Sequence, residues 1–345
     1  MNPIISLILL SSMMAGTILT MTSHHWVSTW LGLELNTLAI IPIISKTHHP
    51  RATEASTKYF LIQAASSALF LLSGITNAHL LGTWDITHLY NNPSKIMFTA
   101  ALATKLGLAP THFWLPEVLQ GVPMLTALII TTWQKIAPMA LLISVWDLIP
   151  SPLTLIMGLL STIIGGLGGL NQTQLRKMMA YSSIAHLGWV LTITTITPNL
   201  ALFNLTLYIT LTSSAMLIMH LTMSNTLQNT TLILSHSPIT TSLFLLSLLS
   251  LGGLPPLSGF SPKWLILQEL TLHHLTPLAL TMAITALFSL MFYLRTTYIS
   301  TMTLPPSTTP LKNTWRLKSY HNTLSLSSLI PTALFLLPIT PLMIQ

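Results

Sequence analysis

The sequence predicts an all-α polytopic membrane protein with about 11 transmembrane helices, two of which are discontinuous. The first observation is composition: 51% of the 345 residues are hydrophobic and only 6% are charged, whereas a soluble domain carries about a quarter charged residues. The second is that apolar runs of membrane-spanning length cover most of the chain. The third is that most charges fall in the short connections between these runs. We therefore expect one integral-membrane domain over residues 1–345.

Each predicted helix corresponds to an apolar run, because a helix needs about 17 to 25 such residues to cross a bilayer. In chain order the runs lie at 3–21, 25–44, 56–80, 95–119, 124–145, 150–169, 175–194, 199–222, 239–270, 276–298 and 323–342. The longest polar connection, 299–322, contains LPPSTTPLKNTWRLKSYHN. This composition predicts a basic surface loop in contact with phospholipid headgroups rather than a further domain.

Two of the runs contain signals that interrupt a helix. In KLGLAPTHFWLPE (105–117), Pro110 removes an amide donor and disfavours helix at Ala109, and Gly107 relaxes the chain. The ninth run is too long for one crossing and contains LGGLPPLSGFSPKW (251–264). Irregular backbone is tolerated in a membrane only where protein encloses it or where it lines a hydrated cavity. We therefore predict discontinuous helices around 105–112 and 251–263, each beside a lysine, as in many ion-transport sites.

The placement of basic residues predicts the orientation of the chain. If every run crosses once, the connections on the side of the N-terminus hold nine basic residues and the opposite side holds only Lys95. The nine are Lys46, Arg51, Lys58, Arg176, Lys177, Arg295, Lys312, Arg316 and Lys318. This asymmetry follows the positive-inside rule, so the N-terminus is expected to face the compartment of synthesis and the C-terminus the other side. The same placement argues against a nucleic-acid partner.

Four charged residues lie deep in the runs instead of in connections: Glu34, Lys105, Lys135 and Lys263. An ionised side chain at the bilayer centre costs about 2.5 to 3.5 kcal/mol on insertion scales. Snorkelling or one neutralising ion pair is the structural alternative, but three lysines cannot all be matched by one deep carboxylate. Burial favours the neutral form of a lysine and a nearby carboxylate favours the charged form. We interpret the four residues as a proton relay.

Two histidines are candidates to extend this relay. Ser182, His186 and Trp189 recur on one helix face. His186 is a candidate because an imidazole in water titrates near neutral pH. His112 lies seven residues beyond Lys105 and would share its face if the helix were continuous. For His186, a histidine packed and hydrogen-bonded between helices is the alternative interpretation.

Several kinds of site are excluded or disfavoured. The chain has no cysteine, which excludes disulfides, thiolate zinc sites and cysteine-ligated iron–sulfur clusters. The paired histidines fall near run ends, so we predict no haem or other metal site. GGLGG (165–169) lacks the preceding strand of a dinucleotide fingerprint and is better explained by close helix packing or a turn. We therefore expect no cofactor bound by this chain.

Three motifs carry a resemblance to a known family. KLGLAPTHFWLPEVLQGVPMLTALIITTWQKIAP (105–138), GLNQTQLRKMMAYSSIAHLGW (169–189) and LSLGGLPPLSGFSPKWLI (249–266) resemble the antiporter-like, proton-translocating membrane subunits of respiratory complex I, the NADH:ubiquinone oxidoreductase. The segment WLGLELNTLAIIPIISK and the composition extend the match over essentially the whole chain. The resemblance implies an antiporter-like fold that lacks the first three helices of longer relatives.

The resemblance also implies a role for each deep charge. Glu34 matches the family's mid-membrane glutamate and is implied to pair with Lys105, the lysine of the first broken helix. Lys135 matches the lysine of the following helix, and Lys263 that of the second broken helix. The implied location is the mitochondrial inner membrane, with the N-terminus in the matrix and the C-terminus in the intermembrane space. The implied partners are other membrane subunits of complex I, including adjacent antiporter-like subunits, while NADH, FMN, iron–sulfur clusters and ubiquinone are bound elsewhere in the complex.

Two other functions stay open. A stand-alone cation/proton antiporter would transport ions as an isolated chain, but it is expected to have a carboxylate-rich cation site and only one deep carboxylate is present. A structural or assembly subunit would carry the same buried charges as inert groups.

Overall fold

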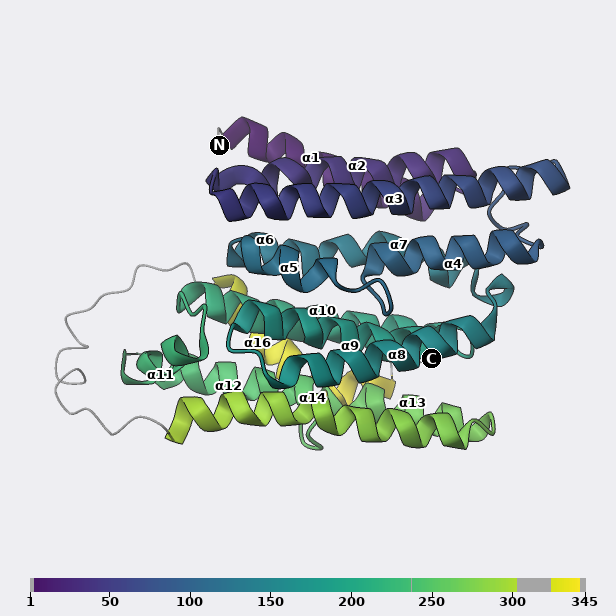
Figure 1. The fold of residues 1–345 in the computed structure, drawn as a ribbon. Coiled ribbons are helices and arrows are strands. Elements are labelled where there is room, and N and C mark those ends of the chain that lie inside the picture. The colour runs from purple at the N-terminus through teal and green to yellow at the C-terminus, as the bar shows by residue number, and fades with distance from the viewer. Residues whose placement is uncertain (1–2, 237, 303–323, 342–345) are drawn as a thin grey trace. The chain divides into compact units, whose positions relative to one another are not determined.

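The computed structural model describes residues 3–236, 238–302 and 324–341, and these residues are almost entirely helical (Figure 1). Over the described residues, extended structure is limited to two isolated bridges. The main helices are α1 (Pro3–Thr22), α2 (Trp26–Ile44), α3 (Pro50–Leu81), α4 (Asn92–Leu106), α5 (Trp114–Gly121), α6 (Met124–Thr131), α7 (Trp133–Ser144), α8 (Ser151–Leu170), α9 (Leu175–Thr194), α10 (Pro198–Leu221), α11 (Leu227–His236), α12 (Pro238–Gly252), α13 (Phe260–Leu272), α14 (Thr276–Met302) and α16 (Leu324–Phe335).

The helices confirm the predicted all-α membrane class. Seven described helices are long and apolar enough to cross a bilayer, and shorter apolar helices accompany them. Both predicted discontinuities are present: α4 ends at Leu106 and α5 begins at Trp114, while α12 ends at Gly252 and α13 begins at Phe260. The total of 11 crossings stays a prediction. Residues 303–322 of the predicted basic loop lie outside the described residues.

Three features differ from the predicted runs. The third helix begins at Pro50 and not at residue 56, because the His49 side chain caps it by accepting from Arg51 N at 3.2 Å and Pro50 suits the first helical turn. An unpredicted interruption at Thr132 separates α6 from α7. The hydroxyls of Thr131 and Thr132 bond back to the carbonyls of Ala127 and Leu128, a pattern that bends helices. The third difference is α11, which lies in a connection where no element was predicted.

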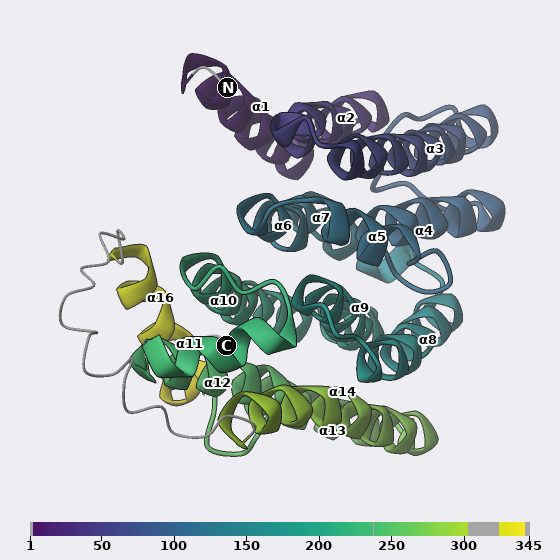
Figure 2. The same ribbon diagram turned by 60° about the vertical axis from the view of Figure 1, so that its left-hand side comes forward.

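The chain divides into two compact units, which are described separately. The first comprises Met1–Ser161 and Leu191–Pro198, and the second comprises Thr162–Val190 and Asn199–Gln345. Within the first unit, α1, α2 and α3 lie side by side in one layer and α4, α5, α6 and α7 in another (Figures 1 and 2). Within the second unit, α14 packs against α11, α12 and α13.

Glycines permit close helix contacts in each unit. In the first, a Cβ added to Gly16 would lie 2.8 Å from the carbonyl oxygen of Gly32, so the backbones of α1 and α2 touch. In the second, a Cβ added to Gly165 would lie 2.6 Å from the backbone nitrogen of Ala185. Small residues allow such approach in membrane bundles. The packing interpretation of GGLGG is thereby confirmed.

Hydrogen bonds between the loops that connect the helices agree with successive helices crossing the membrane in opposite directions inside each unit. In the first unit, the connection after α1 pairs with the one after α3, where Ile86 N donates to His24 O at 2.9 Å. In the second, the connections after α8 and α10 pair, where Leu175 N donates to Asn225 O at 3.1 Å. The Arg295 guanidinium donates to the carbonyl of Leu170, the last residue of α8. A cation is favourable at such a helix C-terminus.

Candidate functional site

The break between α4 and α5 positions the first buried lysine. Lys105 lies in the last turn of α4, and Gly107 follows with φ 76°, a left-handed conformation that favours glycine. Trp114, the first residue of α5, donates from Nε1 to the carbonyl oxygen of Thr104 at 3.1 Å. This bond ties the two half-helices together across the irregular segment, directly beside the lysine.

Lys105 and Lys135 line one cavity in the first unit. Lys105 is 6% exposed and Lys135 is 2% exposed. In the described part of the chain, Lys105 Nζ has no hydrogen-bond partner. The cavity measures about 20 Å³, and its polar lining is completed by Asn36, Thr37, Tyr59, Gln63, Trp114 and Gln134. This space is enough for about one water molecule. Two buried lysines therefore line one water-sized space that also has polar neighbours.

Glu34 lies on α2 beside this cavity. Its carboxylate is within electrostatic range of Lys105 and Tyr59. One carboxylate oxygen is buried without a hydrogen-bond partner among the described residues. The described ion pairs do not include a direct bridge within 4.0 Å between Glu34 and Lys105. The pairing implied by the resemblance is therefore a longer-range interaction in this structure.

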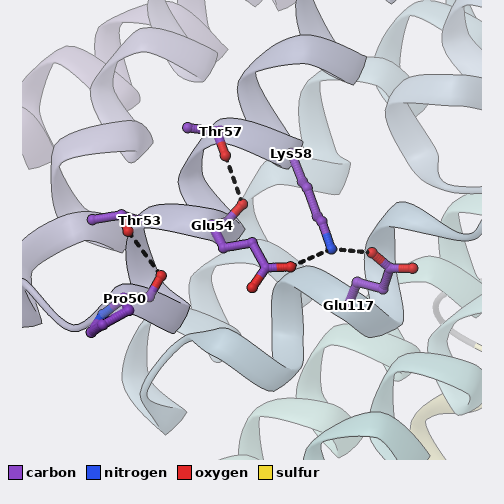
Figure 3. A network of polar contacts seen from close by, with 6 residues as sticks. All are labelled: Pro50, Thr53, Glu54, Thr57, Lys58 and Glu117. Atoms are coloured by element: carbon purple, nitrogen blue, oxygen red, sulfur yellow. Dashed lines mark hydrogen bonds and ion pairs between the residues drawn. The ribbon is translucent and has the colours of Figure 1, made fainter.

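The charged residues near the start of α3 form exposed ion pairs, unlike the buried lysines. The ammonium group of Lys58 lies 2.6 Å from Glu54 and 2.7 Å from Glu117, so that it bridges α3 to α5 (Figure 3). The side chains of all three residues are at least 40% exposed. The structural alternative, a neutralising ion pair that holds helices together, describes Lys58 well. It does not describe Lys105, whose amine is buried without a salt bridge in the described part of the structure.

The second break positions Lys263 in the second unit. Lys263 lies in the first turn of α13, and its Nζ donates to the carbonyl oxygen of Gly252, the last residue of α12, at 2.8 Å. Gly253 follows with φ 82°, and a Cβ added there would lie 3.1 Å from Lys263 Nζ. The amine is thus held directly at the end of the interrupted helix, where the partial negative charge of the helix dipole favours a cation.

His186 lies with Lys263 in one small cavity. The cavity measures about 10 Å³ and is also lined by Trp189, Asn204 and Tyr208. The rings of His186 and Tyr208 are 5.6 Å apart. The structure therefore brings the predicted histidine together with the predicted lysine, in a space close to the minimum for one water.

His112 is placed differently. It lies in the break between α4 and α5, is 3% exposed, and donates from Nδ1 to the carbonyl oxygen of Pro110 at 3.2 Å. Its ring packs 4.2 Å from that of Phe113. It does not line either of the two cavities. A relay role for His112 stays a prediction.

Sequence reasoning did not single out Asn36, Tyr59, Asn204 or Tyr208, which the structure places in the two cavities. Asn36 gave a usable signal, because it stands two residues after Glu34 in an otherwise apolar run. The tyrosines gave none, since aromatic residues are ordinary components of membrane helices. Among the described residues, no group of three or more His, Asp or Glu is placed to hold a metal ion.

Comparisons with known proteins agree along the whole chain. A family model described as NADH:quinone oxidoreductase/Mrp antiporter, TM, matches residues 23–289, and one described as NADH dehydrogenase subunit 2 C-terminus matches 287–344. NADH-ubiquinone oxidoreductase chain 2 of Varanus timorensis is 86% identical over 100% of both chains. The chain 2 of Varanus baritji is 80% identical over the same extent. A chain of respiratory complex I from Thermus thermophilus has a similar fold, with a TM-score of 0.83 at 24% identity, over 98% of this chain and 80% of that one.

Proposed function

The chain belongs to the family of NADH-ubiquinone oxidoreductase chain 2, and we propose that its deep charged residues carry protons through the membrane arm of respiratory complex I. It is a multi-pass subunit of the mitochondrial inner membrane, where its partners are the other membrane subunits of the complex. Electron transfer from NADH to ubiquinone takes place on other subunits. Proton movement through this chain is therefore coupled to that reaction at a distance.

The observation that carries the proposal is the shared cavity of Lys105 and Lys135. A lysine that is buried without a salt bridge can switch between its charged and neutral forms when a nearby charge changes. Lys105 has such a neighbour in Glu34. In the proposed cycle, a charge change elsewhere in the complex weakens the interaction between Glu34 and Lys105. Lys105 then releases its proton toward Lys135.

Lys263 is proposed as the last member of the relay, with His186 as an intermediate. The support is that both side chains line one cavity and that Lys263 lies at a helix break. The coupling is electrostatic, because the protonation of each amine changes the free energy of protonating the next. No covalent chemistry is required of this chain.

The proposed orientation places the N-terminus in the matrix and the C-terminus in the intermembrane space. Its support is the excess of basic residues on one set of connections and the pairing of alternate connections inside each unit. On this scheme the residues 299–322 contribute a basic segment on the matrix side, near phospholipid headgroups. We also retain the single membrane domain over 1–345 as a proposal.

The test is Lys105→Met in the intact complex. Methionine keeps an unbranched side chain only one atom shorter and removes the transferable proton. We expect the complex to assemble and proton translocation to fall by about tenfold or more, since positioned proton transfer contributes about 10²- to 10⁴-fold. Lys95→Met, at the start of the same helix α4, is the matched control and should pump normally. Undiminished NADH oxidation and pumping in the Lys105 variant would instead support a structural subunit.

A further inference from the structure

The side chain of Asn36 is buried without any partner that the described residues supply. Asn36 lies on α2 and is 2% exposed. Both of its amide atoms, Oδ1 and Nδ2, are buried and have no hydrogen-bond partner in the described part of the chain. A buried polar group left unpaired destabilises a fold, and native proteins usually pair such groups with protein atoms or ordered water. The position of this amide therefore calls for a ligand.

Neighbouring contacts hold Asn36 in place. Its amide lies against α1, because a Cβ added to Gly16 would be 2.6 Å from Asn36 Oδ1. Its backbone carbonyl accepts a hydrogen bond from Gln134 Nε2, at 3.3 Å, across to α7. Gln134 is the residue directly before Lys135. The backbone of Asn36 is thus hydrogen-bonded to α7, the helix that carries Lys135.

Asn36 is also one of the residues that line the shared cavity of the two lysines. Asn36, Lys105 and Lys135 all line this space of about 20 Å³, which has room for about one water molecule. A buried water typically makes about three hydrogen bonds, and the two amines with the amide offer that number. An ammonium group can only donate, whereas the amide has an acceptor in Oδ1 and a donor in Nδ2. Asn36 can therefore orient a water in either protonation state of its neighbours.

We propose that Asn36 is a positioning residue that anchors one ordered water between Lys105 and Lys135. The water accepts a proton from the ammonium group of one lysine and passes another of its protons to the neutral amine of the other. One N–H and one O–H bond break while one O–H and one N–H bond form, so the water and the amide end unchanged. This inference depends on the proposed function, since it assigns a water to the proton path already described.

The first test is a water-resolving density map of the intact complex. We expect an ordered water within hydrogen-bond distance of the Asn36 side chain and of at least one of the two lysine amines. A cavity without water would overturn the proposal, as would a water that contacts the lysines but not Asn36. This measurement needs no substitution and decides the matter even if variants fail to assemble.

The second test is Asn36→Leu, which has a similar shape but no polar atoms. Because the amide has no partner in the described protein, its replacement should leave assembly unchanged or improve it. We expect proton translocation by the assembled complex to fall by about tenfold, because the transfer through one water is lost. Normal translocation in this variant would contradict the anchoring role. Asn36→Ser, which keeps a group able to bind water, should restore most of the rate.

Asn77→Leu is the matched control for placing leucine at a buried asparagine. Asn77 lies on α3, outside the cavity, and its Nδ2 donates to His88 O at 3.0 Å. We expect less assembled complex but a normal number of protons per electron. The two proposals fail differently: if Lys105→Met pumps normally, the proposed function is wrong. If Lys105→Met is impaired while Asn36→Leu pumps normally, only the role of Asn36 is wrong.

Discussion

The amine of Lys263 donates a 2.8 Å hydrogen bond to the carbonyl oxygen of Gly252, and thereby closes the gap between α12 and α13. The side chain of Lys263 therefore has two separable roles. It donates a hydrogen bond to a backbone carbonyl at a helix end, and it carries a proton that can be transferred. Each role depends on a different property of the side chain. Substitutions that change one property at a time can separate them.

Lys263→Met should remove both roles, whereas Lys263→Arg should remove only one. Arginine keeps donors for the Gly252 carbonyl but does not release its proton in proteins. We expect the arginine variant to assemble like wild type and to pump at a rate lower by about tenfold or more. The methionine variant should in addition assemble less well, because an unpaired buried carbonyl costs about 1 to 3 kcal/mol. The measurements are the amount of assembled complex and the number of protons moved per NADH oxidised. Equal pumping by the arginine variant and wild type would show that proton release from Lys263 is not required.

Glu34→Gln should reduce pumping without disturbing the fold. Glutamine has the shape of glutamate but lacks the charge that acts on Lys105 and Tyr59. The described structure gives Glu34 no salt bridge to lose, so assembly should be normal. We expect fewer protons per NADH oxidised, measured in sealed vesicles that contain the intact complex. An unchanged proton count would exclude a role for the Glu34 charge in coupling.

Much of the fold could be predicted from the sequence, because apolar length and the glycine–proline pattern act locally. Gly107 and Pro110 predict the break after Lys105, and the glycines and prolines of residues 252–262 predict the break before Lys263. The break at Thr132 was missed because no glycine or proline marks it. It follows from hydroxyls that bond back to carbonyls one turn earlier, and threonine does the same in many unbroken helices of this chain.

The candidate site was predictable in its charged residues and less so in its geometry. A charged lysine raises the free energy of inserting an apolar run into the membrane, whichever way its side chain faces. Lys105, Lys135 and Lys263 therefore stand out by their positions in such runs. Which polar residues face the same cavity depends on how α2, α3, α4 and α7 pack. That packing brings Asn36 and Gln134 together from 98 positions apart. Such long-range proximity leaves no local pattern in a single sequence.

Glu117→Gln should have little effect on stability or pumping. The Lys58–Glu117 pair joins two helices but is largely exposed, and exposed ion pairs contribute little net stability. Lys58 also keeps its second partner, Glu54, at 2.6 Å. We expect the midpoint of thermal inactivation to differ from wild type by no more than the error of the measurement, at low and high salt alike. A large loss of pumping would show that this ion pair holds α5, and with it the broken helix, in its working position.

Gly165→Ala should destabilise the chain through packing alone. The added Cβ would lie 2.6 Å from the backbone nitrogen of Ala185 and 2.9 Å from its Cα, so α8 and α9 must move apart, since neither atom belongs to a flexible side chain. Forcing extra volume into a packed contact costs about 1 to 3 kcal/mol, which exceeds the gain of about 0.5 to 1 kcal/mol from replacing glycine within a helix. We expect less assembled complex and a lower temperature of thermal inactivation, while the protons moved per NADH in the remaining complex stay normal. Gly252→Ala is the matched control for stability, because the nearest atom to its added Cβ is 3.6 Å away, an ordinary van der Waals contact. Equal stability of the two variants would mean that the close approach of α8 to α9 does not limit packing there.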